Sequence, residues 1–138
     1  MKRFFSLLVV LIVTAACTGQ QTISTEQLFP TTVGSFLRTG GPYTEPETGV
    51  ESATYAGPEG TAMLQVRFVG EENVDYALNN LPALATNVEP DEALGERKGV
   101  FFTYGVTEHA AWGNGDWVFV LTASSDAARR IFIAGYGF

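Results

Sequence analysis

Short stretches in which apolar residues occupy every second position constrain the fold of this chain most. The clearest runs from residue 62 to residue 69, where Ala62, Leu64, Val66 and Phe68 alternate with a second set of positions that includes the polar Gln65 and Arg67. Successive side chains of a strand point to opposite faces, so this period predicts a strand with one apolar face. Similar patterns predict strands at residues 34–38, 50–56, 100–106 and 107–112.

The segment at residues 117–123, WVFVLTA, is apolar on both faces and therefore predicts a central strand. Such a strand needs cover on each side. We expect helices on one face, and the N-terminal segment, a second copy or a ligand on the other. The preceding Gly113-Asn114-Gly115-Asp116 contains an Asn-Gly pair, which is typical of a tight β-hairpin.

Two segments have a helical period. Apolar residues recur at Val74, Ala77, Leu78 and Leu81, which predicts a helix over residues 71–80 that ends before Pro82. A second helix is predicted after Ser124 or Ser125, which are suitable capping residues. We expect the adjacent Arg129 and Arg130 on its solvent face.

These elements predict an α+β fold. We expect a two-layer sandwich in which an antiparallel sheet of five or six strands carries two helices on one face. A ferredoxin-like strand order and a cystatin-like arrangement of helix on sheet are the alternatives.

Composition limits the chemistry that the chain can support. Its 138 residues suit one domain, and 46% hydrophobic with 17% charged residues is an ordinary globular balance. One cysteine and one histidine rule out an internal disulfide framework and a multi-histidine metal site within one chain. The net charge of −7 argues against nucleic-acid binding and against a basic membrane-binding patch.

The N-terminus has the pattern of a secretory signal. Met1-Lys2-Arg3 is basic, residues 4–13 are apolar except for Ser6, and the small residues Thr14-Ala15-Ala16 follow. An apolar run of this length is too short to span a membrane, which takes about 20 residues. Cys17, the only cysteine, comes directly after the small residues.

Thr14-Ala15-Ala16-Cys17 resembles the lipobox of bacterial lipoproteins, with Thr14 at a position where leucine is usual. The resemblance implies that residues 1–16 are removed as a signal peptide and that Cys17 is acylated, with palmitate as a typical acyl chain. It also implies attachment to the cell envelope, at the periplasmic face of the outer membrane in a Gram-negative host, because Thr18 is not aspartate. We therefore expect a lipidated tether at 17–27 and a single α+β domain at 28–138, for which the sequence indicates no known family.

Residues capable of catalysis are few and badly placed. His109 is the only ordinary base near neutral pH, and an enzyme would have to use this residue, or carboxylates such as Glu51 or Glu108, in a cleft. Side chains at positions 108 and 109 of a strand point to opposite faces, so they would not act together. The acidic loop that contains Glu89, Asp91, Glu92 and Glu96 lacks the spacing of a calcium loop. We expect no enzyme activity, no metal site and no cofactor.

Aromatic residues near the hairpin are the best binding candidates. Tyr104, Trp112 and Trp117 would suit a partner protein or an apolar ligand if they lay on an exposed sheet face. The sequence thus predicts a lipid-anchored envelope protein with a non-enzymatic binding or interaction domain, whose partner is an envelope protein or a second copy. The alternative is a carrier or sensor of a small apolar ligand bound between sheet and helices.

Overall fold

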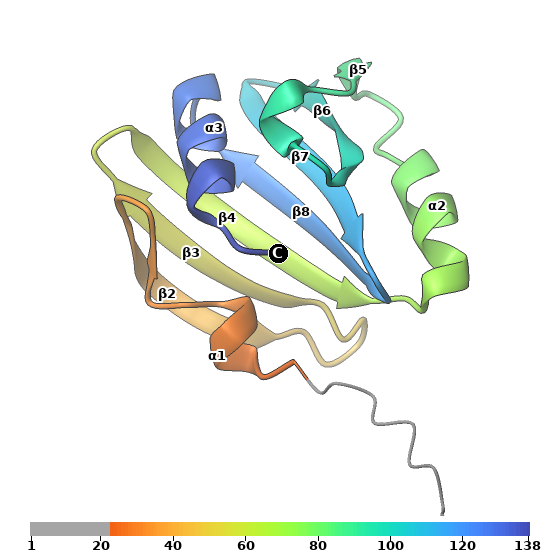
Figure 1. The fold of residues 1–138 in the computed structure, drawn as a ribbon, viewed down its shortest axis with the longest axis horizontal. Helices are drawn as coiled ribbons and strands as arrows, with labels where there is room; N and C mark the ends of the chain where they lie inside the picture. Colours follow the sequence, from red (N-terminus) through yellow and green to blue (C-terminus); the bar gives the residue numbers. More distant parts are fainter. Residues whose placement is uncertain (1–22) are drawn as a thin grey trace, which may run out of the picture.

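The computed structural model describes residues 23–138, so the expected signal peptide and Cys17 lie outside the described residues. One antiparallel sheet of eight strands dominates it (Figure 1). The strands are β1 (Thr32–Val33), β2 (Phe36–Thr44), β3 (Glu51–Gly57), β4 (Gly60–Phe68), β5 (Thr86–Glu89), β6 (Lys98–Tyr104), β7 (Thr107–Asn114) and β8 (Trp117–Ala123). The helices are α1 (Thr25–Leu28), α2 (Glu71–Asn79), α3 (Asp126–Gly135) and the 3₁₀ turn η1 (Glu92–Leu94).

The sheet has the order β1-β2-β3-β4-β8-β7-β6-β5. Two meanders, β1–β4 and β5–β8, meet where β4 pairs with β8, for example at Leu64 opposite Leu121. The predicted sheet of five or six strands with two helices is therefore wrong, since the described residues form eight strands and three α-helices. The missed strands carry little signal: β1 has two residues, and all four residues of β5 are exposed.

Strand β2 is longer than its sequence suggests. It was expected to end at Arg38, but it continues to Thr44 through Gly40, Gly41 and Pro42, with shifts of register against β3. Gly41 has φ +83°, and a Cβ at this position would lie 2.6 Å from the main-chain oxygen of Ser52. The glycine thus permits a bulge that keeps the strand paired.

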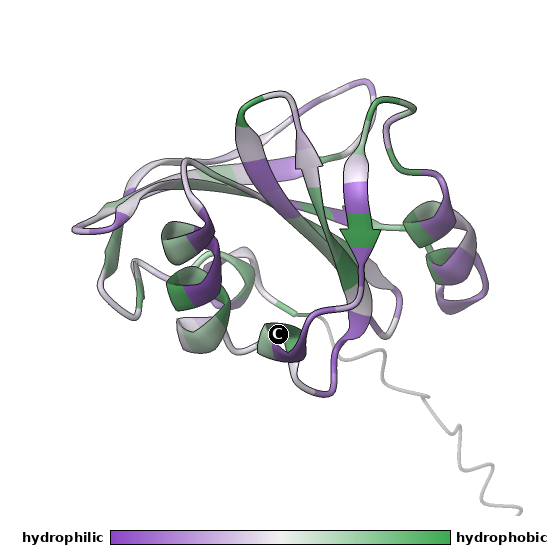
Figure 2. Cartoon of the chain, turned by 90° about the horizontal axis from the view of Figure 1, so that it is seen from above, coloured by the Kyte–Doolittle hydropathy of each residue, from purple (hydrophilic) through white to green (hydrophobic). Residues whose placement is uncertain are grey.

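Both predicted helices are confirmed, but they do not share a face of the sheet. Helix α3 is capped by the Ser125 hydroxyl, which accepts from the Ala128 N–H at 3.1 Å, and it buries Phe132 in the core. Helix α2 lies against the opposite face, where a Cβ on Gly113 would be only 2.3 Å from Cγ1 of Val74. Figure 2 shows the two helices on either side of the twisted strands.

We call the face covered by α1 and α3 the inner face. Its core consists largely of aromatic side chains that contact one another: Phe36, Tyr55, Trp112, Phe119, Phe132 and Tyr136. The Tyr136 hydroxyl donates to the Leu28 main-chain oxygen at 2.7 Å and so ties the two ends of the domain together. Leu28 enters the core from the short helix α1.

The other face of the sheet is the outer face. Along β8 it carries Val118 and Val120, which explains why that strand is apolar on both sides. Helix α2 covers the Val118 end, whereas Val120 stays half-buried. A helix of the chain itself thus supplies much of the cover that we had assigned to an N-terminal segment, a second copy or a ligand.

Candidate functional site

The three aromatic residues proposed for binding do not form one site. Trp112 is fully buried on the inner face, stacked on Phe119 at a centroid distance of 5.4 Å, and its indole N–H donates to the main-chain oxygen of Phe138 at 3.0 Å. Trp117 lies half-buried at one end of the inner face, edge-on to Phe68. Tyr104 is on the outer face and is 42% exposed. The structure therefore places Trp112 in the core and leaves Tyr104 as the most accessible of the three.

His109 lies on the outer face with both ring nitrogens occupied. Its Nε2 is 2.7 Å from the Thr107 hydroxyl and its Nδ1 is 3.1 Å from the Thr122 hydroxyl. The ring stacks on Phe102 at 4.9 Å. Through these non-covalent contacts, His109 of β7 holds the neighbouring strands β6 and β8 in place.

Glu108 points to the other face, as the alternation of strand side chains requires. It lies 3.3 Å from the Arg129 guanidinium and accepts from the Thr103 hydroxyl at 3.3 Å. Glu51 is at the start of β3, and β4 and β8 separate that strand from β7. The structure does not bring the three candidate catalytic residues together.

The packing of His109 predicts a pH dependence of stability. Burial lowers the pKa of His109 below 6.5, the charge of Arg129 lowers it further, and Glu108 opposes both. Below pH 6.5 the unfolded chain therefore binds a proton that the folded chain resists. The free energy of unfolding is expected to fall as the pH drops from 6.5 to the folded-state pKa of His109, measured by urea denaturation.

His109→Gln is the matched control, because glutamine keeps hydrogen-bonding capacity but does not titrate. The variant is expected to lose this decline. The pKa values of Asp91 and Asp126 are lowered by their hydrogen bonds to arginine, so their stabilising contributions are lost only as the pH falls below about 3.8. An equal decline in both proteins between pH 6.5 and 4.5 would contradict the assignment to His109.

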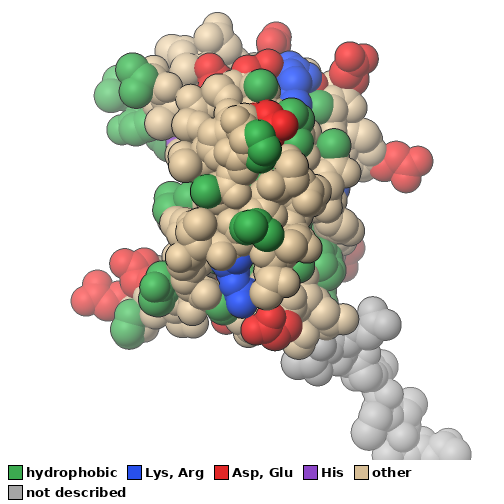
Figure 3. All heavy atoms as spheres, turned by 90° about the vertical axis from the view of Figure 1, so that its left-hand side faces the viewer, with side chains coloured by type: hydrophobic (Ala, Val, Ile, Leu, Met, Phe, Trp, Pro, Cys, Tyr) green, Lys and Arg blue, Asp and Glu red, His purple; other side chains and the backbone are tan. Residues whose placement is uncertain are grey.

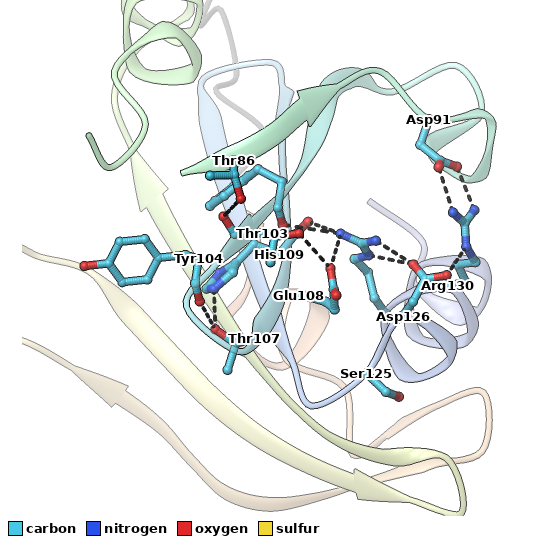
Figure 4. A network of polar contacts seen from close by, with 12 residues as sticks. Thr86, Asp91, Thr103, Tyr104, Thr107, Glu108, His109, Ser125, Asp126 and Arg130 are labelled. Atoms are coloured by element: carbon cyan, nitrogen blue, oxygen red, sulfur yellow. Dashed lines mark hydrogen bonds and ion pairs between the residues drawn. The ribbon is translucent and has the colours of Figure 1, made fainter. Parts of the chain in front are cut away.

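A charged network joins α3 to β6, β7 and η1 (Figure 4). Arg129 was predicted on the solvent face of the helix, but its side chain is buried. Its guanidinium donates hydrogen bonds to the Asp126 carboxylate and, at 2.8 Å, to the main-chain oxygen of His109. The same guanidinium lies 4.0 Å from the centre of the Phe101 ring. Arg130 binds both carboxylate oxygens of Asp91 at 2.8 Å. The helical period of α3 does not reveal that Arg129 is buried, because a buried arginine needs charged and polar partners, and these lie on strands distant in the sequence.

Asp91 has a structural role in the acidic loop. Its carboxylate also accepts from the Ala93 N–H at 2.8 Å and so caps η1. Between residues 23 and 138, no three histidine, cysteine, aspartate or glutamate residues are grouped so that they could hold a metal ion.

One end of the sheet exposes a group of large apolar side chains, which we call the apolar corner. Tyr104 and Val106 belong to the β6–β7 hairpin, and Leu84 and Val88 lie just before and within the neighbouring strand β5. Their exposed fractions are 42%, 94%, 74% and 49%, respectively. Figure 3 shows hydrophobic side chains gathered at the upper left edge of the face that it draws, and Figure 4 shows the Tyr104 ring pointing away from the charged network.

Comparison with known proteins supports the fold and assigns no family. No protein-family model matches the chain, and no curated protein sequence matches it. A solved structure of a GTP-binding regulator from Thermotoga maritima has a similar fold, with a TM-score of 0.54 and 11% sequence identity, over 80% of this chain and 85% of that one. Within the described residues, none of the helices has the length and apolar character needed to cross a membrane.

Proposed function

We propose that this chain is a lipid-anchored cell-envelope protein whose folded domain is a non-enzymatic binding domain for another envelope protein. The motif ending at Cys17 supports the anchor. The apolar corner supports the binding role and is the observation that carries it. A soluble domain rarely exposes several large apolar side chains together unless they form an interaction site.

The position of the corner favours a protein partner over the lipid surface. Figure 1 shows β5 and β6 at the opposite end of the domain from α1, where the tether enters. Lipid attached to Cys17 would therefore hold the α1 end nearer the bilayer. The exposed carboxylate of Glu89 lies in β5 itself, and negative charge disfavours contact with anionic lipid headgroups.

A photo-reactive amino acid at position 106 tests this proposal in native envelopes. We expect cross-linking to one partner from Val106 and none from Glu47, an exposed control position in the β2–β3 loop. The purified partner is then expected to bind the wild-type chain at least about tenfold more tightly than Val106→Asp. Removing a side chain that anchors an interface lowers the binding free energy by about 1.4 kcal/mol or more, which corresponds to this factor.

Two outcomes would overturn this assignment. Equal cross-linking from both positions would show non-specific contact. A dimer seen by size-exclusion chromatography with light scattering, and abolished by Val106→Asp, would identify a second copy of the chain as the occupant.

A second candidate function, binding of a small apolar ligand, is favoured by a hollow beneath α2. It has a volume of about 210 Å³ and is lined mainly by valine residues. The hollow lies on the outer face, whereas between α3 and the sheet aromatic side chains pack against one another.

A further inference from the structure

The hollow beneath α2 continues into a wider one of about 460 Å³, and we call the two together the α2 groove. Arg67, Val69 and Ala77 border both parts. The narrower part is largely apolar and is lined by Val50, Val118 and Val120, with Gln65 at its side. The combined space is of the size that small molecules occupy in proteins.

Arg67 gives the groove its charge. Among the six Lys and Arg residues at positions 23–138, it alone makes no hydrogen bond or ion pair through its side chain within the described structure. The other five are held by carboxylates or main-chain oxygens, as Lys98 is by Asp75 and Arg97 by Phe138. No aspartate or glutamate lines either part of the groove, although the chain has a net charge of −7.

The two asparagines of the groove each donate a hydrogen bond to the main chain. The side-chain amide of Asn73 donates to the main-chain oxygen of Val69 at 2.9 Å, and that of Asn80 donates to the main-chain oxygen of Tyr76 at 2.7 Å. The Tyr76 ring is 71% exposed at the rim. Arg67 therefore remains as the charged donor available to a ligand, next to an apolar floor.

We propose that the α2 groove binds a small amphipathic carboxylate. The acid group pairs with the Arg67 guanidinium, whose planar donors match two carboxylate oxygens, and a short acyl or aryl chain lies against Ala77, Val118 and Val120. This inference rests on the second candidate function above, for which it names the ligand class. It is independent of the apolar corner.

The test uses the mature chain with Cys17→Ser, so that no lipid is present, and follows amide NMR signals during titration with octanoate. We expect saturable shifts confined to α2, β4 and β8. Arg67→Gln is expected to weaken octanoate binding by roughly tenfold or more, because hydrogen bonds to charged groups contribute most to such pairs. Lys98→Gln, which removes an equal charge outside the groove lining, is expected to leave the affinity unchanged.

Two further probes separate the possible failures. Octanol, which lacks the negative charge, is expected to bind at least about tenfold more weakly than octanoate. Equal binding of the two would refute the carboxylate assignment but would still support binding of a small apolar ligand. Absence of binding by both would end both proposals. A peptide with a free apolar C-terminus that binds in place of octanoate, and loses binding with Arg67→Gln, would replace the small molecule by a protein terminus.

Discussion

Replacing Cys17 by serine is expected to abolish labelling of the chain by palmitate and to move it from the membrane fraction to the soluble fraction. The chain has a single cysteine, so no second sulfur can carry the lipid. Buried acyl chains stabilise membrane attachment by about 0.8 kcal/mol per CH₂, and two or more chains hold a protein firmly. The measurement is metabolic labelling with a palmitate analogue, followed by fractionation of the envelope.

Thr18→Ser is the matched control, because it changes the neighbouring residue and keeps the sulfur. We expect its labelling and fractionation to equal those of the wild type. A wild-type chain that takes up no palmitate would refute the lipoprotein proposal. So would a Cys17→Ser chain that is processed and fractionates as the wild type does.

Trp112→Ala is expected to lower the free energy of unfolding by about 3–5 kcal/mol, which is typical of removing a large buried aromatic side chain. The side chain is fully buried and packs on Phe119 and Tyr136. Its indole N–H donates to the main-chain oxygen of Phe138, which the alanine would leave with one partner fewer. Urea denaturation with an unchanged slope would measure the loss.

Trp117→Ala is the comparison, because Trp117 is half-buried and contacts the exposed Phe68. Its loss is expected to destabilise the fold by less than the loss of Trp112. Trp112→Ala with wild-type stability would contradict the core assignment of Trp112 and return it to the list of binding candidates.

Local patterns predicted those elements whose residues carry a clear period or turn signal. The alternation of Ala62, Leu64 and Val66 corresponds to β4, and the Asn-Gly pair corresponds to the β7–β8 turn. The period that starts at Val74 corresponds to α2. Each of these signals depends only on neighbours along the chain, which is why the sequence carries them.

The candidate site was less predictable. Trp112, Trp117 and Tyr104 lie within fourteen residues of one another, yet the pleat of β6–β8 distributes them over two faces. Arg129 of α3 has no sequence signal for burial, because its partners Glu108 and the main-chain oxygen of Phe102 come from strands β7 and β6. The same holds for the α2 groove, where Arg67 of β4 meets Ala77 of α2 and Val120 of β8.

The sequence by itself determined where the main strands, the two longer helices and the hairpin turn lie, because backbone geometry and side-chain period act over a few residues. The tertiary structure decided that β4 pairs with β8, that α2 and α3 cover opposite faces, and that Arg67 borders the α2 groove. These outcomes depend on which distant surfaces bury one another. Which surfaces bury one another depends on packing across the whole domain, so it cannot be predicted from any single segment of the chain.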